Sequence, residues 1–96
     1  MRKTVGSIRV LELGTTLQYS IFGSRQEGYG IEIVQKEKDG SVIKNSQSNI
    51  TYYVNKIRWI ARLLMQGSVF AGSLQEILQE LEILPFSKGE LEASPF

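Results

Sequence analysis

The side-chain chemistry of this chain is limited by two missing residue types. Its 96 residues include no histidine and no cysteine, which removes the commonest general base, the thiolate nucleophile and the usual transition-metal ligands. Glu76 and Glu80 lie four residues apart, but nothing gathers a third carboxylate around them. The sequence therefore predicts no catalytic centre, no metal site and no cofactor, and a protein that is not an enzyme.

Two arginines form the next group of side chains that could bind a ligand. A spacing of four residues places Arg58 and Arg62 on one side of a helix, near Asn55 and Lys56, where they could hold phosphates. The ordinary interpretation is a solvated helix flank whose aliphatic stems cover apolar neighbours. We favour that interpretation, because two arginines do not make a nucleic-acid groove.

Four aromatic residues admit a nucleic-acid interpretation. They are Tyr19, Phe22, Tyr29 and Tyr53. On one exposed surface, with basic side chains nearby, they would form a stacking platform for single-stranded nucleic acid. Aromatic residues at alternating strand positions are more often part of the core, and we interpret these as core. A small nucleic-acid-binding protein that uses the basic N-terminal half remains the alternative function.

A group of large side chains faces away from the predicted core of the first helix. At 100° per residue, Tyr52, Trp59 and Leu63 lie at about 200°, 180° and 220°, whereas the apolar stripe centres near 330°. Exposed apolar patches mark association sites, and Trp and Tyr are enriched in binding hot spots. We therefore predict a protein-interaction site, flanked by Lys56 and Arg62, through which the protein self-associates as a homo-oligomer or docks another protein. The alternative is cover within the monomer by the two phenylalanines near the C-terminus.

The N-terminal half predicts the strands that support this helix. Apolar residues recur at every second position, in segments rich in Ile, Val, Leu, Tyr and Phe. The pairs Gly14-Thr15 and Asp39-Gly40 suit a type II′ and a type I′ hairpin turn, respectively. We predict four strands, at residues 7–13, 16–22, 29–37 and 41–45.

Gly28 and Gly30 flank Tyr29 where the third predicted strand begins. Glycine loops that bind phosphate lie between a strand and a helix, so this position does not fit that role. We assign the two glycines to turn geometry or to close packing against another backbone.

The hydrophobic period changes after residue 49 from two to about 3.6, which indicates helices. Thr51 is the expected N-cap of the first helix, and Gly67 the left-handed residue that ends it. Ser73 and Glu76 have the spacing of a capping box that opens a second helix. We predict helices at residues 52–66 and 74–83. The fold class is α+β, an antiparallel meander of about four strands packed on two antiparallel helices.

Length and composition describe one globular domain, with 42% hydrophobic residues in 96. We assign it to residues 1–84 and expect residues 85–96, which show no period, to form a flexible tail. The net charge is +1, but residues 1–62 carry ten basic and five acidic side chains, and the remainder one and five. Apolar runs are too short for a membrane span, and the lack of cysteine fits a reducing cytosol, so we expect a cytoplasmic protein with no membrane partner.

Part of the chain resembles a known family. Residues 29–84 combine a Tyr-Gly-Ile-x-Ile strand, Tyr29 to Ile33, with a helix start at Ile50-Thr51 and a short helix opened by Ser73-Leu74. This order is similar to that of a family of small proteins of unknown function from Gram-positive anaerobic bacteria. The resemblance implies the same fold and a bacterial, cytosolic origin, but no site residues. Where that family opens its first helix with acidic and lysine-rich residues, this chain has Tyr52-Tyr53.

Overall fold

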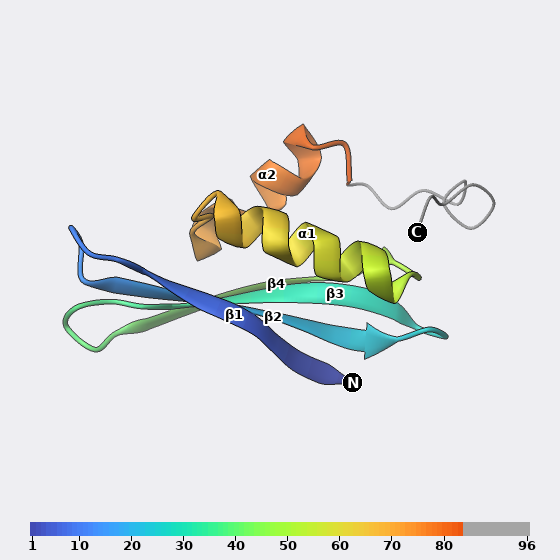
Figure 1. Ribbon diagram of the computed structural model, residues 1–96, viewed down its shortest axis with the longest axis horizontal. Helices are drawn as coiled ribbons and strands as arrows, with labels where there is room; N and C mark the ends of the chain where they lie inside the picture. Colours follow the sequence, from blue (N-terminus) through green and yellow to red (C-terminus); the bar gives the residue numbers. More distant parts are fainter. Residues whose placement is uncertain (84–96) are drawn as a thin grey trace.

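A computed structural model describes residues 1–83 as a four-stranded antiparallel sheet with a helical layer on one face (Figure 1). The strands are β1 (Arg2–Val10), β2 (Thr15–Ser24), β3 (Gly28–Lys36) and β4 (Val42–Thr51), and each pairs with the next in chain order. The helical layer contains α1 (Val54–Gln66), the 3-10 turn η1 (Ala71–Ser73) and α2 (Leu74–Glu80). The predicted α+β meander with two helices is confirmed. The predicted tail, residues 85–96, lies outside the described residues.

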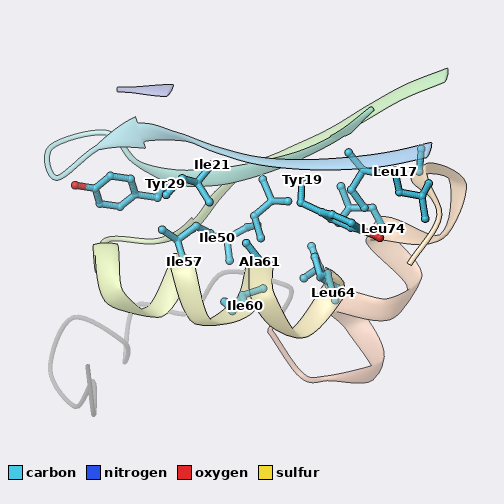
Figure 2. Close-up of a cluster of buried hydrophobic side chains, with 14 residues drawn as sticks. Leu17, Tyr19, Ile21, Tyr29, Ile50, Ile57, Ile60, Ala61, Leu64 and Leu74 are labelled. Carbon is cyan, nitrogen blue, oxygen red and sulfur yellow. The ribbon is translucent and has the colours of Figure 1, made fainter. Parts of the chain in front are cut away.

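The core lies between the sheet and α1 (Figure 2). Residues at every second position of β2 and β3 point toward the helix, and α1 contributes the stripe that its 3.6-residue period predicts. The side chains with 0% exposure include Leu17, Tyr19, Ile21, Ile31, Ile33, Ile50, Ile57, Ile60, Ala61, Leu74 and Leu78. Burial of a Leu or Ile side chain contributes about 1.5–3 kcal/mol to stability relative to exposure. The inner sides of the sheet and of α1 are therefore both used by the core.

The first hairpin turn differs from the prediction. β1 ends at Val10 and β2 begins at Thr15, and these two residues pair across a four-residue loop. Gly14, at φ +65°, is the last residue of that loop, so the predicted two-residue type II′ turn is wrong. The error arose because Leu11 and Leu13 alternate with Glu12 as strand residues do, although they lie in the loop, out of phase with Ile8 and Val10, and are 81% and 56% exposed.

The second hairpin turn is also of another type. Only Gly40 has positive φ, at +91°, whereas a type I′ turn needs two such residues. The Gly40 N–H donates to the Glu37 carbonyl (3.0 Å), and the Glu37 N–H donates to the Ser41 carbonyl (2.8 Å), which defines a three-residue loop. The Asp39 carboxylate accepts bonds from the hydroxyl (2.6 Å) and N–H (2.9 Å) of Ser41 instead. These two bonds lower the pKa of Asp39.

β4 is longer than predicted and contains a bulge. Tyr29 pairs with Thr51 and Ile31 pairs with Gln47, so three residues of β4 lie opposite Gly30. Asn49, at φ +55°, forms part of this irregularity. The polar residues 46–49, which predict a break, belong to an edge strand whose side chains mostly face solvent. The bulge reverses the alternation and turns Ile50 into the core at 0% exposure.

The ends of α1 are set by other residues than the sequence indicates. Thr51 belongs to β4, and its hydroxyl accepts the N–H of Tyr53 (3.1 Å), while Tyr53 stands at the N-cap with an extended backbone. At the C-terminal end, Gly67 has φ −85° and Ser68 has the positive φ, at +52°. The N–H of Ser68 donates to the Met65 carbonyl (3.0 Å), which is half of a Schellman motif. The predicted roles of Thr51 as N-cap and Gly67 as left-handed residue are therefore wrong.

α2 begins near the predicted position but lacks the predicted cap. Within residues 1–83 the Ser73 side chain makes no capping bond, because Ser73 ends η1 and its backbone is not extended (ψ 2°). The capping box of Ser73 and Glu76 is therefore wrong. The helix ends at Glu80, before the predicted residue 83, and Glu82 at φ +60° reverses the chain.

A network of polar side chains fastens the segment between α1 and α2 to the sheet. The Tyr19 hydroxyl donates to the Val69 carbonyl (2.9 Å), and Gln35 accepts the N–H of Ala71 through its side-chain oxygen (3.0 Å). Asn45 donates to the Ala71 carbonyl and to the Gln75 side-chain oxygen, both at 2.7 Å. No hydrophobic period predicts these contacts, yet they fix the chain between the two helices.

The buried hydroxyl of Tyr19 should make the protein less stable at alkaline pH. Burial raises the pKa of Tyr19 to about 12, above the ordinary value of about 10 that applies to the unfolded chain. The folded state therefore keeps a proton that the unfolded state loses, so stability should fall as pH rises from about 10 to about 12. Urea unfolding at pH 9 and pH 11 measures this fall. Tyr19→Phe, which lacks the hydroxyl, should be less stable at pH 9 by about 1 kcal/mol and should lose less on the change to pH 11.

Candidate functional site

The outer side of α1 presents an exposed large apolar side chain. Trp59 is 48% exposed, although the opposite side of α1 is buried through Ile57, Ile60, Ala61 and Leu64. Residues three and four positions away are its neighbours on a helix, and these include Lys56, Arg62 and Leu63. Lys56 and Leu63 are half-buried and Arg62 is exposed. We call these four residues of α1, with Trp59 at their centre, the Trp59 surface.

Tyr52 does not share the helix with the other predicted site residues. α1 begins at Val54, so Tyr52 lies in the connection from β4, and its predicted helical position is wrong. It is half-buried and lines a depression of about 240 Å³ together with Arg25 of the β2–β3 loop and Tyr29. Whether Tyr52 contributes to binding stays a prediction. The helical wheel misplaced it because the wheel extended the helix two residues too far.

The four candidate stacking aromatics are not on one surface. Tyr19 and Tyr29 are buried at 0% and 6% exposure in the core. Phe22 lies on the opposite face of the sheet, where its ring centroid is 5.2 Å from the Arg2 guanidinium carbon. Arg2 also forms an ion pair with Glu32 at 2.9 Å. The core interpretation is confirmed for Tyr19 and Tyr29. It is wrong for Phe22 and for Tyr53, which is half-buried at the N-cap of α1. The nucleic-acid alternative loses its stacking platform.

Carboxylates and a serine–lysine pair are the groups of residues 1–83 to consider for metal binding or nucleophilic chemistry. No group of three or more Asp or Glu side chains that could hold a metal ion occurs in this part of the chain. Ser41 precedes Lys44 by three residues, a spacing found in serine–lysine nucleophiles. In an extended segment, however, residues three apart point to opposite sides, and the Ser41 hydroxyl already donates to Asp39. This pair offers no activated nucleophile.

A basic groove between β1 and α1 was missed by sequence reasoning. It has a volume of about 270 Å³, and its charged lining residues are Lys3, Arg58 and Arg62. The helix spacing brings the two arginines together, as predicted. Lys3 joins them only because β1 extends to Arg2 and pairs Lys3 with Ile21. The predicted first strand, 7–13, began too late to reveal this neighbour.

Taken together, fold and surface define a small α+β protein in which a four-stranded meander carries a helix with an exposed tryptophan and a basic flank. The chain belongs to DUF6514, a family of unknown function whose profile matches residues 3–82. Neither the curated proteins nor the solved structures include a match. Within the described part of the chain, none of the helices has the length and apolar character needed to cross a membrane.

Proposed function

We propose that this protein is a non-catalytic interaction module that self-associates through the Trp59 surface. The observation that carries this proposal is the exposure of Trp59, 48%, on a helix whose inner side is packed in the core. Tryptophan at the centre of a contact is the residue type that most often dominates binding energy. Its half-buried neighbour Leu63 adds apolar area, and Lys56 and Arg62 add charge at the rim.

A second copy of this chain is the partner that the charges favour. The Trp59 surface carries two cationic side chains. In contrast, α2 exposes Glu76 and Glu80, and Glu82 is exposed just after the helix ends. In a two-fold dimer each chain offers the same surface to the other, so a basic and an acidic region can pair twice. Such pairing requires no other protein and makes a homodimer the proposed assembly.

Replacement of Trp59 by alanine tests the proposal. We expect the dimer dissociation constant to rise about 30-fold or more, because loss of a hot-spot residue costs about 2 kcal/mol or more. Sedimentation velocity over a concentration series measures this change. Leu11→Ala is the matched control, since Leu11 is an exposed apolar residue of the β1–β2 loop, and it should leave the constant unchanged. A wild-type protein that stays monomeric at every concentration, or equal weakening by both variants, would contradict self-association through this surface.

We also propose a bacterial origin and a cytoplasmic location. The motif order of residues 29–84, which resembles that of small proteins from Gram-positive anaerobes, supports the first. The absence of cysteine, which suits a reducing compartment, supports the second. Fractionation of the source cells, with immunodetection of the protein, tests the location.

A further inference from the structure

The groove between β1 and α1 has a cationic wall and an apolar floor. The cationic groups are Lys3 of β1 and Arg58 and Arg62 of α1. The apolar side chains that line the same space are Val5, Ile21 and Met65. The volume of about 270 Å³ lies just below the range of pockets for drug-sized ligands, so it suits a small molecule.

A bulge in β1 brings Lys3 to this groove. Thr4 pairs with Ser20 and Gly6 pairs with Tyr19, which leaves Val5 as an extra residue. Because directly paired residues project to the same face, Lys3 lies on the face of its partner Ile21, toward the helix. Gly6 then allows close contact, since a Cβ at Gly6 would lie 2.8 Å from the Met65 sulfur. The helix thus packs tightly on β1 at Gly6 and leaves space at Lys3.

The cations of the groove have no counter-charge within residues 1–83. Among residues 1–83, no acidic side chain lines the groove. Arg2, which neighbours Lys3 in β1, forms its ion pair with Glu32 on the other face of the sheet. Three like charges around one concave space repel each other and raise the local concentration of anions. A ligand that carries more than one negative charge would relieve this repulsion.

We propose that this groove binds a small organic phosphate. The planar guanidinium groups of Arg58 and Arg62 can each donate two bonds to phosphate oxygens, and Lys3 supplies a third charge from the opposite wall. The organic part of the ligand then packs on the apolar floor formed by Val5 and Met65. A phosphate dianion suits three cations better than a carboxylate does, because a carboxylate brings a single charge.

Titration of the protein with phenyl phosphate and with inorganic phosphate tests this site. In ¹H–¹⁵N NMR spectra we expect saturable shifts of the backbone amides of residues 3–6 and 58–66, and tighter binding of phenyl phosphate. Arg58→Gln should weaken phenyl phosphate binding about tenfold, which corresponds to about 1.4 kcal/mol. Lys3→Gln, at an exposed strand position, should act in the same direction. Arg58 is outside the Trp59 surface, so failure here leaves the proposed dimer untouched.

A charge-matched control separates the groove from the general charge of the protein. Arg9 is an exposed arginine of β1, the strand of Lys3, and does not line the groove. Arg9→Gln should therefore leave the affinity for phenyl phosphate unchanged. Equal weakening by Arg9→Gln and Arg58→Gln would overturn the site, as would the absence of shifts at the groove amides. Equal affinity for the two phosphates would overturn the assignment to an organic phosphate. Dispersed spectra of each variant exclude unfolding as the cause.

Discussion

Gly30→Ala should destabilise the protein by about 3 kcal/mol or more, the largest single effect that we expect on stability. The Cβ of an alanine at this position would lie against the carbonyl oxygen of Gln47 and 2.8 Å from the Cα of Ser48. Both of these contacts are with backbone, which cannot move aside as a flexible side chain can. Insertion of one carbon into a packed interior commonly costs about 1–3 kcal/mol, and a clash with backbone falls at or above the upper end.

The clash also affects how α1 is positioned. Gly30 lies opposite the bulge of β4, and the bulge turns Ile50 into the core directly before α1 begins. To make room for a Cβ, residues 47–50 would have to move away from β3, which would shift Ile50 and the start of the helix. The loss therefore includes core contacts as well as the local strain.

Urea unfolding of Gly30→Ala and Gly72→Ala measures this effect. Gly72, in η1, is the matched control, because a Cβ there meets nothing within 4 Å and its backbone is not in the left-handed region. Gly72→Ala should be neutral or stabilising by about 0.4–1 kcal/mol, since alanine reduces the freedom of the unfolded chain. Similar unfolding free energies for Gly30→Ala and the wild type would show that β4 does not approach Gly30 as described.

The sequence predicted the parts of the fold that depend on hydrophobic period. Leu17, Tyr19 and Ile21 alternate at a period of two and are all buried, because one face of an antiparallel sheet must be covered. The apolar stripe of α1 was predicted likewise, because its buried residues recur at the helical period of about 3.6. Gly28 and Gly30 were assigned to turn geometry or to close backbone packing, and at Gly30 the structure shows the second of these roles, against the Gln47 carbonyl.

Local ends and turns were predicted less well, because several residues satisfy the same local rule. Gly67 and Ser68 are adjacent, and the short-range preference favours glycine for the left-handed position, yet Ser68 has it. The N–H of Val69 reaches the Leu64 carbonyl (3.1 Å) in that arrangement, and Val69 also accepts the bond from Tyr19. A contact between residues 19 and 69 thus helps to choose the helix end, and no local pattern reveals it.

In the candidate site, too, the features set by helix geometry were predicted and those set by contacts between distant segments were not. The wheel placed Trp59 on the outer side of α1 because helix geometry alone determines that side, and its exposure follows. Lys3 was not associated with Arg58, because their proximity depends on the bulge at Val5 and on the register of β1 with β2. Register between distant segments is fixed by the sum of many contacts, so it cannot be read from the spacing of a few residues.

Gln35→Glu should destabilise the protein by about 3 kcal/mol at pH 7 and by much less near pH 4. The Gln35 side chain, 7% exposed, accepts the N–H of Ala71 (3.0 Å) and donates to the Glu37 carboxylate. The carboxylate of the variant removes that donor and places a second negative charge in a nearly buried position, which costs several kcal/mol. Glu37 keeps the hydroxyl bond from Thr15 (2.9 Å), but this bond cannot neutralise the added charge.

The pH dependence separates this charge effect from simple loss of packing. The neighbouring negative charge raises the pKa of the introduced carboxyl above the ordinary value of about 4.3 that applies in the unfolded chain. The folded variant therefore binds more protons than the unfolded one as pH falls from 7 toward 4, so its deficit relative to the wild type should shrink. A protonated carboxyl also restores one donor and one acceptor between Ala71 and Glu37.

Urea unfolding of Gln35→Glu and the wild type at pH 7 and pH 4 gives the two deficits. Gln18→Glu, on the opposite face of the sheet, is the control and should change stability by less than about 0.5 kcal/mol at either pH. An equal deficit of Gln35→Glu at both pH values would mean that the side chains at positions 35 and 37 do not meet.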